Sequence, residues 1–408
     1  MIGKTGMKYR RFGRADWEVS AFSLGCMRLP AAELGASARE DDLSVSMIRY
    51  AVDAGVNYLD VGYPYDLVRQ ERLCRLIGRA LRDKYRQKVK LTATLPISAL
   101  TSSSDCDRYL NEQLRWLETD TVEFLLLATL NRENWPKVQE LGVLGWAERA
   151  MSDGRVGQLG FSFHDHYQAL RTVIAAYDHW TLCQFQFSYM DVDHDPGVSG
   201  IKYAADKGLA VVVTEPLRGG RLAAEPPESV AKVWAGAREQ RTLAEWGLRF
   251  VWNLPEIATV VGDVRTLQET AEYIAVADSA QPDSLSVQEL VLLSNVREAY
   301  QKLNPIRCTS CRACMPCPEG IDVPRIFEIY NDAIKYRDVE TGRCIYRDEQ
   351  HWAANYTQCG VCVRACAKSL PILDWLQPAH DLLTSSYALA AAELQSQTPS
   401  RKTGGKNE

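Results

Sequence analysis

The chain has 408 residues, of which 46 % are hydrophobic and 24 % charged, a composition typical of folded globular proteins. Its 47 basic and 52 acidic residues leave a formal charge of −5, and no basic tract predicts binding to nucleic acid. No apolar run approaches the ~18 residues that a membrane span requires. The N-terminal sequence MIGKTGMKYRRFG has no apolar export segment, so the cytoplasm is the expected location.

Short β-branched runs alternate with segments of helical periodicity from residue 23 to about residue 280, and Leu43–Asp53 is an example of the helical pattern. A hairpin of Tyr9–Phe12 and Val19–Phe22 is expected to close the bottom of the fold. Eight β-then-α units in roughly 260 residues predict a (β/α)8 barrel. A doubly wound open sheet is the main alternative, but no G-x-G-x-x-G follows the first strand. The predicted strands are Ser23–Gly25, Asn57–Val61, Leu91–Leu95, Glu123–Ala128, Gln158–Phe163, Leu182–Ser188, Ala210–Thr214 and Thr259–Val261.

Seven of the 12 cysteines form two runs near the C-terminus. The first run reads C-x2-C-x2-C-x2-C-P and the second C-x2-C-x3-C. Thiolates at this pitch on a tight loop can converge on the irons of a cubane cluster. The runs consist of Cys308, Cys311, Cys314 and Cys317, and of Cys359, Cys362 and Cys366. They predict an electron-transfer domain that binds iron–sulfur clusters.

Zinc and disulfide bonds are the competing interpretations of these runs. Structural zinc usually takes two well-separated C-x2-C pairs, whereas here four cysteines lie within ten residues. Disulfide bonds need an oxidising compartment, and the sequence contains no export signal that would lead there. The scattered cysteines Cys26, Cys74, Cys106 and Cys183 are interpreted as small buried apolar residues.

Several segments carry a resemblance to one family: DAGVNYLDVGYPYD (53–66), GFSFHD (160–165), QFQFS (184–188), VVVTEPLRGGRLA (211–223) and MPCPEGIDVP (315–324). Together they resemble the branch of the aldo-keto reductases that carries a C-terminal 4Fe-4S ferredoxin-like domain. The resemblance implies a TIM barrel over residues 7–300 and a small, mainly helical iron–sulfur domain over residues 301–380. The polar tail at 395–408 is expected to be disordered.

Aldo-keto reductases use an aspartate, a tyrosine, a lysine and a histidine at successive strand ends. Asp60 and Tyr65 match the first two members of this tetrad. Thr94, however, stands at the lysine position, and Ala128 stands at the histidine position. The tyrosine acts as general acid, and its ordinary pKa of about 10 leaves it dependent on the lysine cation. Half of the catalytic set that the resemblance implies is therefore absent.

Two functional interpretations stay open. In the first, His164 and Arg218 rebuild a different acid–base set with Asp60 and Tyr65, and the chain is an oxidoreductase that couples cluster electron transfer to a redox site at the barrel mouth. In the second, hydride chemistry is lost, and a catalytically inactive pseudo-reductase docks to a partner and passes electrons to it. Both interpretations expect a protein that donates or accepts electrons, and neither names the small-molecule substrate.

The resemblance also makes NADP(H) a candidate cofactor. Gln184 matches the residue that contacts the nicotinamide carboxamide, and Ser162 lies at a strand end nearby. After the eighth strand Gly262 keeps a tight turn and Arg265 could meet a phosphate, whereas Asp263 would repel one. The complete expected set is Ser162, Gln184, Ser188, Glu215, Pro216, Leu217, Gly262 and Arg265.

By analogy with two-cluster ferredoxins, one [4Fe-4S] cluster takes Cys308, Cys311, Cys314 and Cys366, and a second takes Cys317, Cys359 and Cys362. The fourth ligand of the second cluster is open, because the family-like position three residues before Cys359 is Tyr356. Cys344 is the candidate spare thiol, and a three-iron cluster or a non-cysteine ligand are the alternatives. An amphipathic helix at Val323–Tyr336 is expected between the runs.

Overall fold

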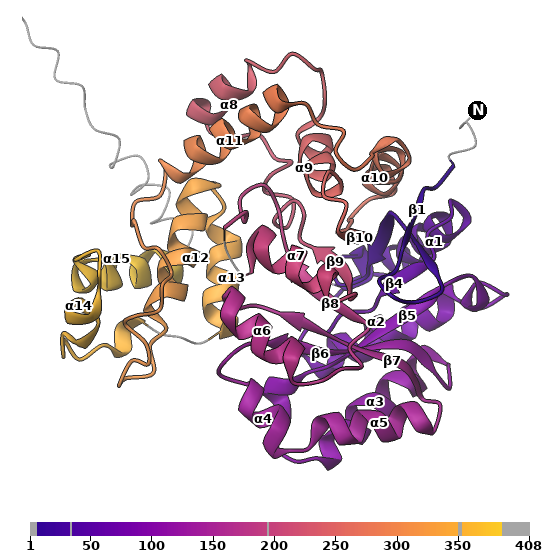
Figure 1. Cartoon of the computed structure of the whole chain (residues 1–408). Helices are drawn as coiled ribbons and strands as arrows, with labels where there is room; N and C mark the ends of the chain where they lie inside the picture. The colour runs from indigo at the N-terminus through magenta and orange to yellow at the C-terminus, as the bar shows by residue number, and fades with distance from the viewer. Residues whose placement is uncertain (1–5, 33–34, 194–195, 350–352, 386–408) are drawn as a thin grey trace, which may run out of the picture. The chain divides into compact units, whose positions relative to one another are not determined.

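The computed structural model describes residues 6–32, 35–193, 196–349 and 353–385 (Figure 1). The tail at 395–408, for which we expect disorder, lies outside the described residues. The chain divides into two compact units, one within residues 1–224 and 238–291 and the other within 225–237 and 292–408. We call them the barrel unit and the cysteine unit. None of the helices in the described ranges has both the length and the apolar character needed to cross a bilayer.

The barrel unit contains eight parallel strands that close on themselves in the order β10-β3-β4-β5-β6-β7-β8-β9. This closure confirms the predicted (β/α)8 fold and excludes the doubly wound open sheet. Because all eight strands are parallel, their C-terminal ends open at one mouth. The strands are β3 (Phe22–Gly25), β4 (Tyr58–Asp60), β5 (Lys90–Leu95), β6 (Val122–Leu130), β7 (Val156–Phe163), β8 (Leu182–Gln186), β9 (Ala210–Thr214) and β10 (Ile257–Asp263).

The end of the barrel opposite the mouth is closed by the N-terminal hairpin. As the sequence predicts, β1 (Tyr9–Arg11) pairs antiparallel with β2 (Glu18–Ser20). Phe12 follows β1, is fully buried, and packs against the rings of Tyr58 and Phe124 at centroid distances of 6.0 and 5.0 Å. Both of these aromatic residues lie near the start of their strands, so the floor of the barrel is apolar.

Helices follow the strands of the barrel unit along the chain (Figure 1). The predicted helix Leu43–Asp53 is longer at its start, because Ser37 and Glu40 form a capping box. The helices are α1 (Ala38–Asp53), α2 (Leu67–Ala80), α3 (Ser104–Leu117), α4 (Trp135–Glu140), α5 (Val143–Ser152), α6 (Tyr167–Ala175), α7 (Gly197–Asp206), α9 (Leu243–Trp252) and α10 (Leu267–Ser279). Helix α11 (Val287–Gln301) begins in the barrel unit and ends in the cysteine unit.

The cysteine unit is helical in its described part. The helix expected at Val323–Tyr336 is α12 (Val323–Lys335), which is capped by Asp322 and has Pro324 in its first turn. Its apolar face enters a core with Ile306, Leu376 and Leu383. The other helices of the unit are α8 (Glu228–Trp234), α13 (Val339–Glu349), α14 (Val361–Ala365) and α15 (Ile372–Thr384).

Candidate functional site

Asp60, the last residue of β4, carries a carboxylate that points into the barrel mouth. Its Oδ2 accepts a hydrogen bond of 3.0 Å from Nε2 of Gln184 on β8, and its Oδ1 accepts one of 3.0 Å from the backbone N–H of Gly62. The side chain is only 6 % exposed, and no cation of the described residues pairs with it. Burial therefore raises the pKa of Asp60 to about 6, and the two hydrogen bonds offset part of that effect.

The positions expected to hold lysine and histidine face the same interior without supplying an acid or a base. Thr94 on β5 and Ala128 on β6 are both buried. Tyr65 is 52 % exposed, and its hydroxyl shares a hydrogen bond of 3.0 Å with Oγ1 of Thr129. Crowding around this hydroxyl raises the pKa of Tyr65 above its ordinary value. Tyr65 is thus a weaker acid than a free tyrosine.

An ion-pair network that the sequence analysis did not identify lies across the strand ends. Arg28, three residues beyond β3, pairs with Glu215 at 3.3 Å and with Asp263 at 3.6 Å. Burial raises the pKa of Asp263, the negative charge of Glu215 raises it further, and Arg28 opposes both effects. Asp60 also raises the pKa of Asp263, so three carboxylates share one part of the mouth. The position of Arg28 just after the first strand was the available sequence signal.

Two of the predicted cofactor residues have polar atoms at the mouth. Ser162 Oγ accepts a hydrogen bond of 2.7 Å from the backbone N–H of Thr129. Gln184 Oε1 is buried and has no hydrogen-bond partner, which marks it as an acceptor for a ligand amide. Ser188 is engaged elsewhere, since its hydroxyl donates to Asp191, which also pairs with Arg218.

The region beyond β10 contains carboxylates where the resemblance expects a phosphate. The backbone N–H of Arg265 donates to Oε2 of Glu269 at 2.7 Å, and Thr266 caps α10. Gly262 leaves no room for a side chain, because a Cβ there would lie 2.3 Å from the ring of Phe22. The side chain of Arg265 is exposed.

The remaining predicted barrel residues differ in their exposure. Pro216 and Leu217 are buried just after β9, whereas His164 is exposed at the end of β7. The backbone N–H of His164 donates to the carbonyl of Leu130 at 3.1 Å. The structure therefore does not bring His164 into the Asp60 hydrogen bonds, and its catalytic role stays a prediction.

Replacing Asp60 by asparagine is expected to stabilise the barrel at neutral and alkaline pH. The folded pKa of about 6 exceeds the ordinary value of about 3.9, so the native state binds the proton more tightly and stability falls as pH rises between these values. Asp60→Asn removes this penalty and should raise the free energy of unfolding by up to about 3 kcal/mol at about pH 8, with little change at about pH 4. Urea unfolding at both pH values measures the difference.

The exposed Asp120 provides the matched control, and Asp120→Asn should leave both unfolding curves unchanged. A stabilisation by Asp60→Asn that is as large in acid as in alkali would contradict a buried, uncompensated charge.

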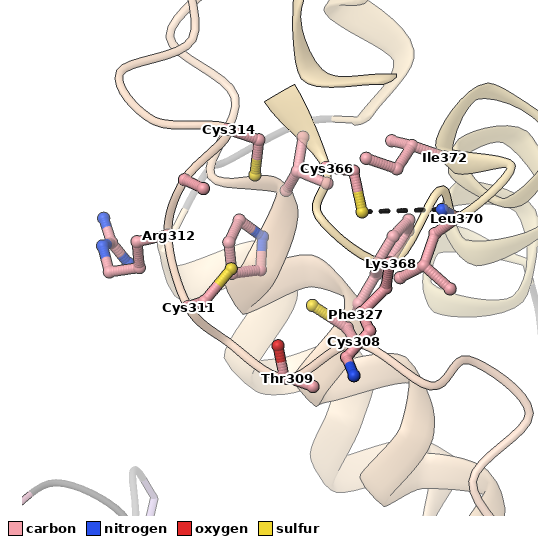
Figure 2. Close-up of a pocket in the computed structure, with 13 residues that line it drawn as sticks. Cys308, Thr309, Cys311, Arg312, Cys314, Phe327, Cys366, Lys368, Leu370 and Ile372 are labelled. Atoms are coloured by element: carbon pink, nitrogen blue, oxygen red, sulfur yellow. Dashed lines mark hydrogen bonds between the residues drawn. The ribbon is translucent and has the colours of Figure 1, made fainter. Parts of the chain in front are cut away.

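A pocket in the cysteine unit is lined by four thiols drawn from both cysteine runs (Figure 2). The sulfur atoms of Cys308, Cys311, Cys314 and Cys366 surround the same space. Phe327 and Ile372 provide apolar wall, and the backbone N–H groups of Ser310 and Leu370 donate to the sulfurs of Cys308 and Cys366 at 3.5 Å. These four cysteines are the set expected for the first cluster.

The loop that carries Cys308 and Cys311 is fixed to α12 at two points. Asn331 Oδ1 accepts from the backbone N–H of Ile306 at 3.0 Å, and Asn331 Nδ2 donates to the carbonyl of Ile306 at 2.7 Å. Arg312 pairs with Asp322, the N-cap of α12, at 3.0 Å. The loop therefore presents its thiols from a supported backbone.

The second group of predicted ligands lies nearby but is less complete. Burial raises the pKa of Cys362, and the neighbouring Cys317 and Cys359 raise it further. Cys344 is exposed on α13, beside Arg347. The structure thus brings three run cysteines together and places Cys344 elsewhere.

Across the described ranges, no three His, Cys, Asp or Glu side chains converge closely enough to hold a single metal ion. A structural zinc site brings its sulfur ligands to about 2.3 Å from one point, whereas cluster ligands are distributed around several irons. The pocket of four thiols, with apolar walls and backbone N–H donors to sulfur, has the chemistry of the second kind of site.

Comparison with known proteins places the barrel unit. The model of the aldo/keto reductase family matches residues 21–290, which is more than half of the chain and ends before the first cysteine run. A reductase of Bacillus halodurans in its holo form is 20 % identical, with a TM-score of 0.57 over 71 % of this chain and 96 % of that chain. A Klebsiella pneumoniae reductase in complex with NADPH is 19 % identical, with a TM-score of 0.56 over 72 % of this chain and 95 % of that chain. These neighbours share the barrel fold, and the family match shows that the chain belongs to the aldo/keto reductase family.

Proposed function

We propose that this aldo/keto reductase is an iron–sulfur enzyme in which the cysteine unit exchanges electrons with a redox site at the barrel mouth. The observation that carries the proposal is the pocket lined by Cys308, Cys311, Cys314 and Cys366. A [4Fe-4S] cluster bound there would supply one-electron transfer. The residues would hold it by four thiolates, and the cations of Arg312 and Lys368, which also line the pocket, would offset the negative charge.

NADP(H) is the proposed two-electron carrier at the barrel mouth. The family and the unpartnered Oε1 of Gln184 support binding of the nicotinamide carboxamide. Asp263 and the Glu269 carboxylate oppose the phosphates, so we expect the nicotinamide end to be held more firmly than the phosphate end. A fluorescence titration with NADPH, compared between the natural chain and Gln184→Ala, measures this contribution.

The physiological partner would be an electron donor or acceptor protein, because one-electron clusters need a redox protein to fill or empty them. A reducing compartment such as the cytoplasm would keep the run cysteines available as thiols. The small-molecule substrate is that of the barrel mouth and follows from activity screening rather than from the residues described above.

Anaerobic purification followed by analysis of iron and acid-labile sulfide tests the cluster proposal. We expect both elements in the protein, together with an EPR signal after reduction by dithionite. Because the thiols of the first pocket come from both runs, the clusters should survive gel filtration. Stoichiometric zinc without iron or sulfide would sink the proposal.

The pseudo-reductase is the second candidate, and the buried Thr94 and Ala128 favour it. Neither side chain can donate or accept a catalytic proton at the positions where the family uses lysine and histidine. This candidate expects clusters that reduce and reoxidise normally, with no NADPH oxidation on any carbonyl compound. Turnover of a carbonyl by the natural chain would rule it out.

A further inference from the structure

The second group of thiols has three members, and we propose that it forms a three-thiolate centre with one exchangeable iron. Cys317, Cys359 and Cys362 would hold a cluster whose fourth iron has no cysteine ligand from the chain. This inference rests on the proposed iron–sulfur function. It distinguishes the second centre chemically from the first, which has four thiols in one pocket.

The pitch of the two runs identifies the missing ligand. Cys308, Cys311 and Cys314 follow one another at three-residue intervals, and the same interval places Tyr356 ahead of Cys359 and Cys362. The side chain of Tyr356 packs against the core of the cysteine unit, and its backbone N–H donates to the carbonyl of Ala353 at 3.2 Å. The position that would complete the second set therefore has a packing role.

Cys344 is held away from the run cysteines by the position of α13. Gly342 on this helix lies so close to α12 and α15 that an added Cβ would be 3.1 Å from Ala333 and 3.2 Å from Leu383. Arg343 Nε also donates to the carbonyl of Leu382 at 3.1 Å. The exposed Cys344 thiol would need this packed helix to unwind before it could serve the second group.

No other cysteine of the chain is available. Of the 12 cysteines, seven belong to the runs, and Cys344 is accounted for by α13. The other four are buried in the barrel unit: Cys26, Cys74, Cys106 and Cys183. The chain therefore offers the second centre three thiols.

The surroundings of the second group supply oxygen atoms and access to solvent. Thr357 Oγ1 donates to Oε1 of Glu319 at 3.1 Å, which joins the loop after Cys317 to the loop before Cys359. Both Glu319 and Cys359 are exposed. An iron on this side would take water or a carboxylate oxygen, which iron exchanges more readily than a thiolate.

The exchange reaction is balanced. An oxidised [3Fe-4S]+ cluster accepts one electron from dithionite and then binds one Fe2+ to give [4Fe-4S]2+. Mild oxidation removes one electron and releases the same Fe2+. The three thiolates stay bound throughout, and no sulfide is gained or lost.

EPR spectroscopy of the reconstituted full chain tests the inference. After anaerobic treatment with ferricyanide, the natural chain should give the signal of an oxidised three-iron cluster, and Fe2+ with dithionite should abolish it. Tyr356→Cys completes the four-thiol set and should cause loss of the three-iron signal. Tyr356→Phe is the matched control and should keep the signal, as should Cys344→Ser.

A second readout does not depend on folding of the cysteine variant. Isotopically labelled Fe2+ added to the oxidised natural chain should enter one iron site only, as Mössbauer spectroscopy would report. Two stable four-iron clusters without exchange, or loss of the second cluster in Cys344→Ser, would overturn the inference and leave the proposed function intact. Absence of all iron and sulfide would instead remove the proposed function itself.

Discussion

Cys366→Ser is expected to remove the first cluster and to destabilise the cysteine unit. Cys366 is the member of the first pocket that comes from the second run, so its loss separates the two chain segments that the cluster would join. A ligand bound to the folded state alone stabilises it, and losing such tight binding should lower the free energy of unfolding by at least about 3 kcal/mol. Iron and sulfide analysis together with thermal unfolding measures both effects.

Cys344→Ser is the matched control for this experiment, because it removes an exposed thiol from the same unit. It should leave the iron content and the unfolding transition of the natural chain unchanged. A Cys366→Ser protein with its full complement of iron would show that Cys366 is not a ligand.

Restoring the family's two missing side chains should create or increase carbonyl reductase activity. In the Thr94→Lys, Ala128→His double variant, the lysine would face the barrel interior beside Asp60, where burial leaves the carboxylate without a cation. The new charge should lower the pKa of both Asp60 and Tyr65, and restored general acid catalysis is worth roughly 10²–10⁴-fold. NADPH oxidation with a panel of aldehydes measures the gain.

Two controls keep this experiment interpretable. Thr94→Met with Ala128→His fills the space left by Thr94 without a charge and should show no gain. Tyr65→Phe in the restored background should abolish the gain, because it removes the hydroxyl that now bonds to Thr129. A folded double variant that binds NADPH and still reduces no aldehyde would show that more than the tetrad has been lost.

The strands of the barrel were predictable because each one is a short apolar run between helices, and their order follows the chain. The local path at the end of β6 was not. The prediction ended this strand at Ala128, whereas it continues to Leu130 through a register shift, with Thr129 in a left-handed backbone conformation of φ 50°. This irregularity brings Thr129 to the hydroxyl of Tyr65, and nothing in the sequence pattern indicates it.

The candidate site divides in the same way. The spacing of the runs predicted which four cysteines meet in one pocket, because a three-residue pitch on a tight loop restricts where thiols can point. The pairing of Arg28 with Glu215 and Asp263 depends on residues far apart in the chain, so only the closed barrel reveals it. The same holds for Cys344, whose exclusion follows from the packing of α13.

The first pocket has a consequence for the order in which the protein is made. Its last ligand, Cys366, emerges from the ribosome after every strand of the barrel and after α12 and α13. Domains generally fold as units from the N-terminus during synthesis. The barrel can therefore fold before the pocket is complete, and cluster insertion becomes the closing step of maturation.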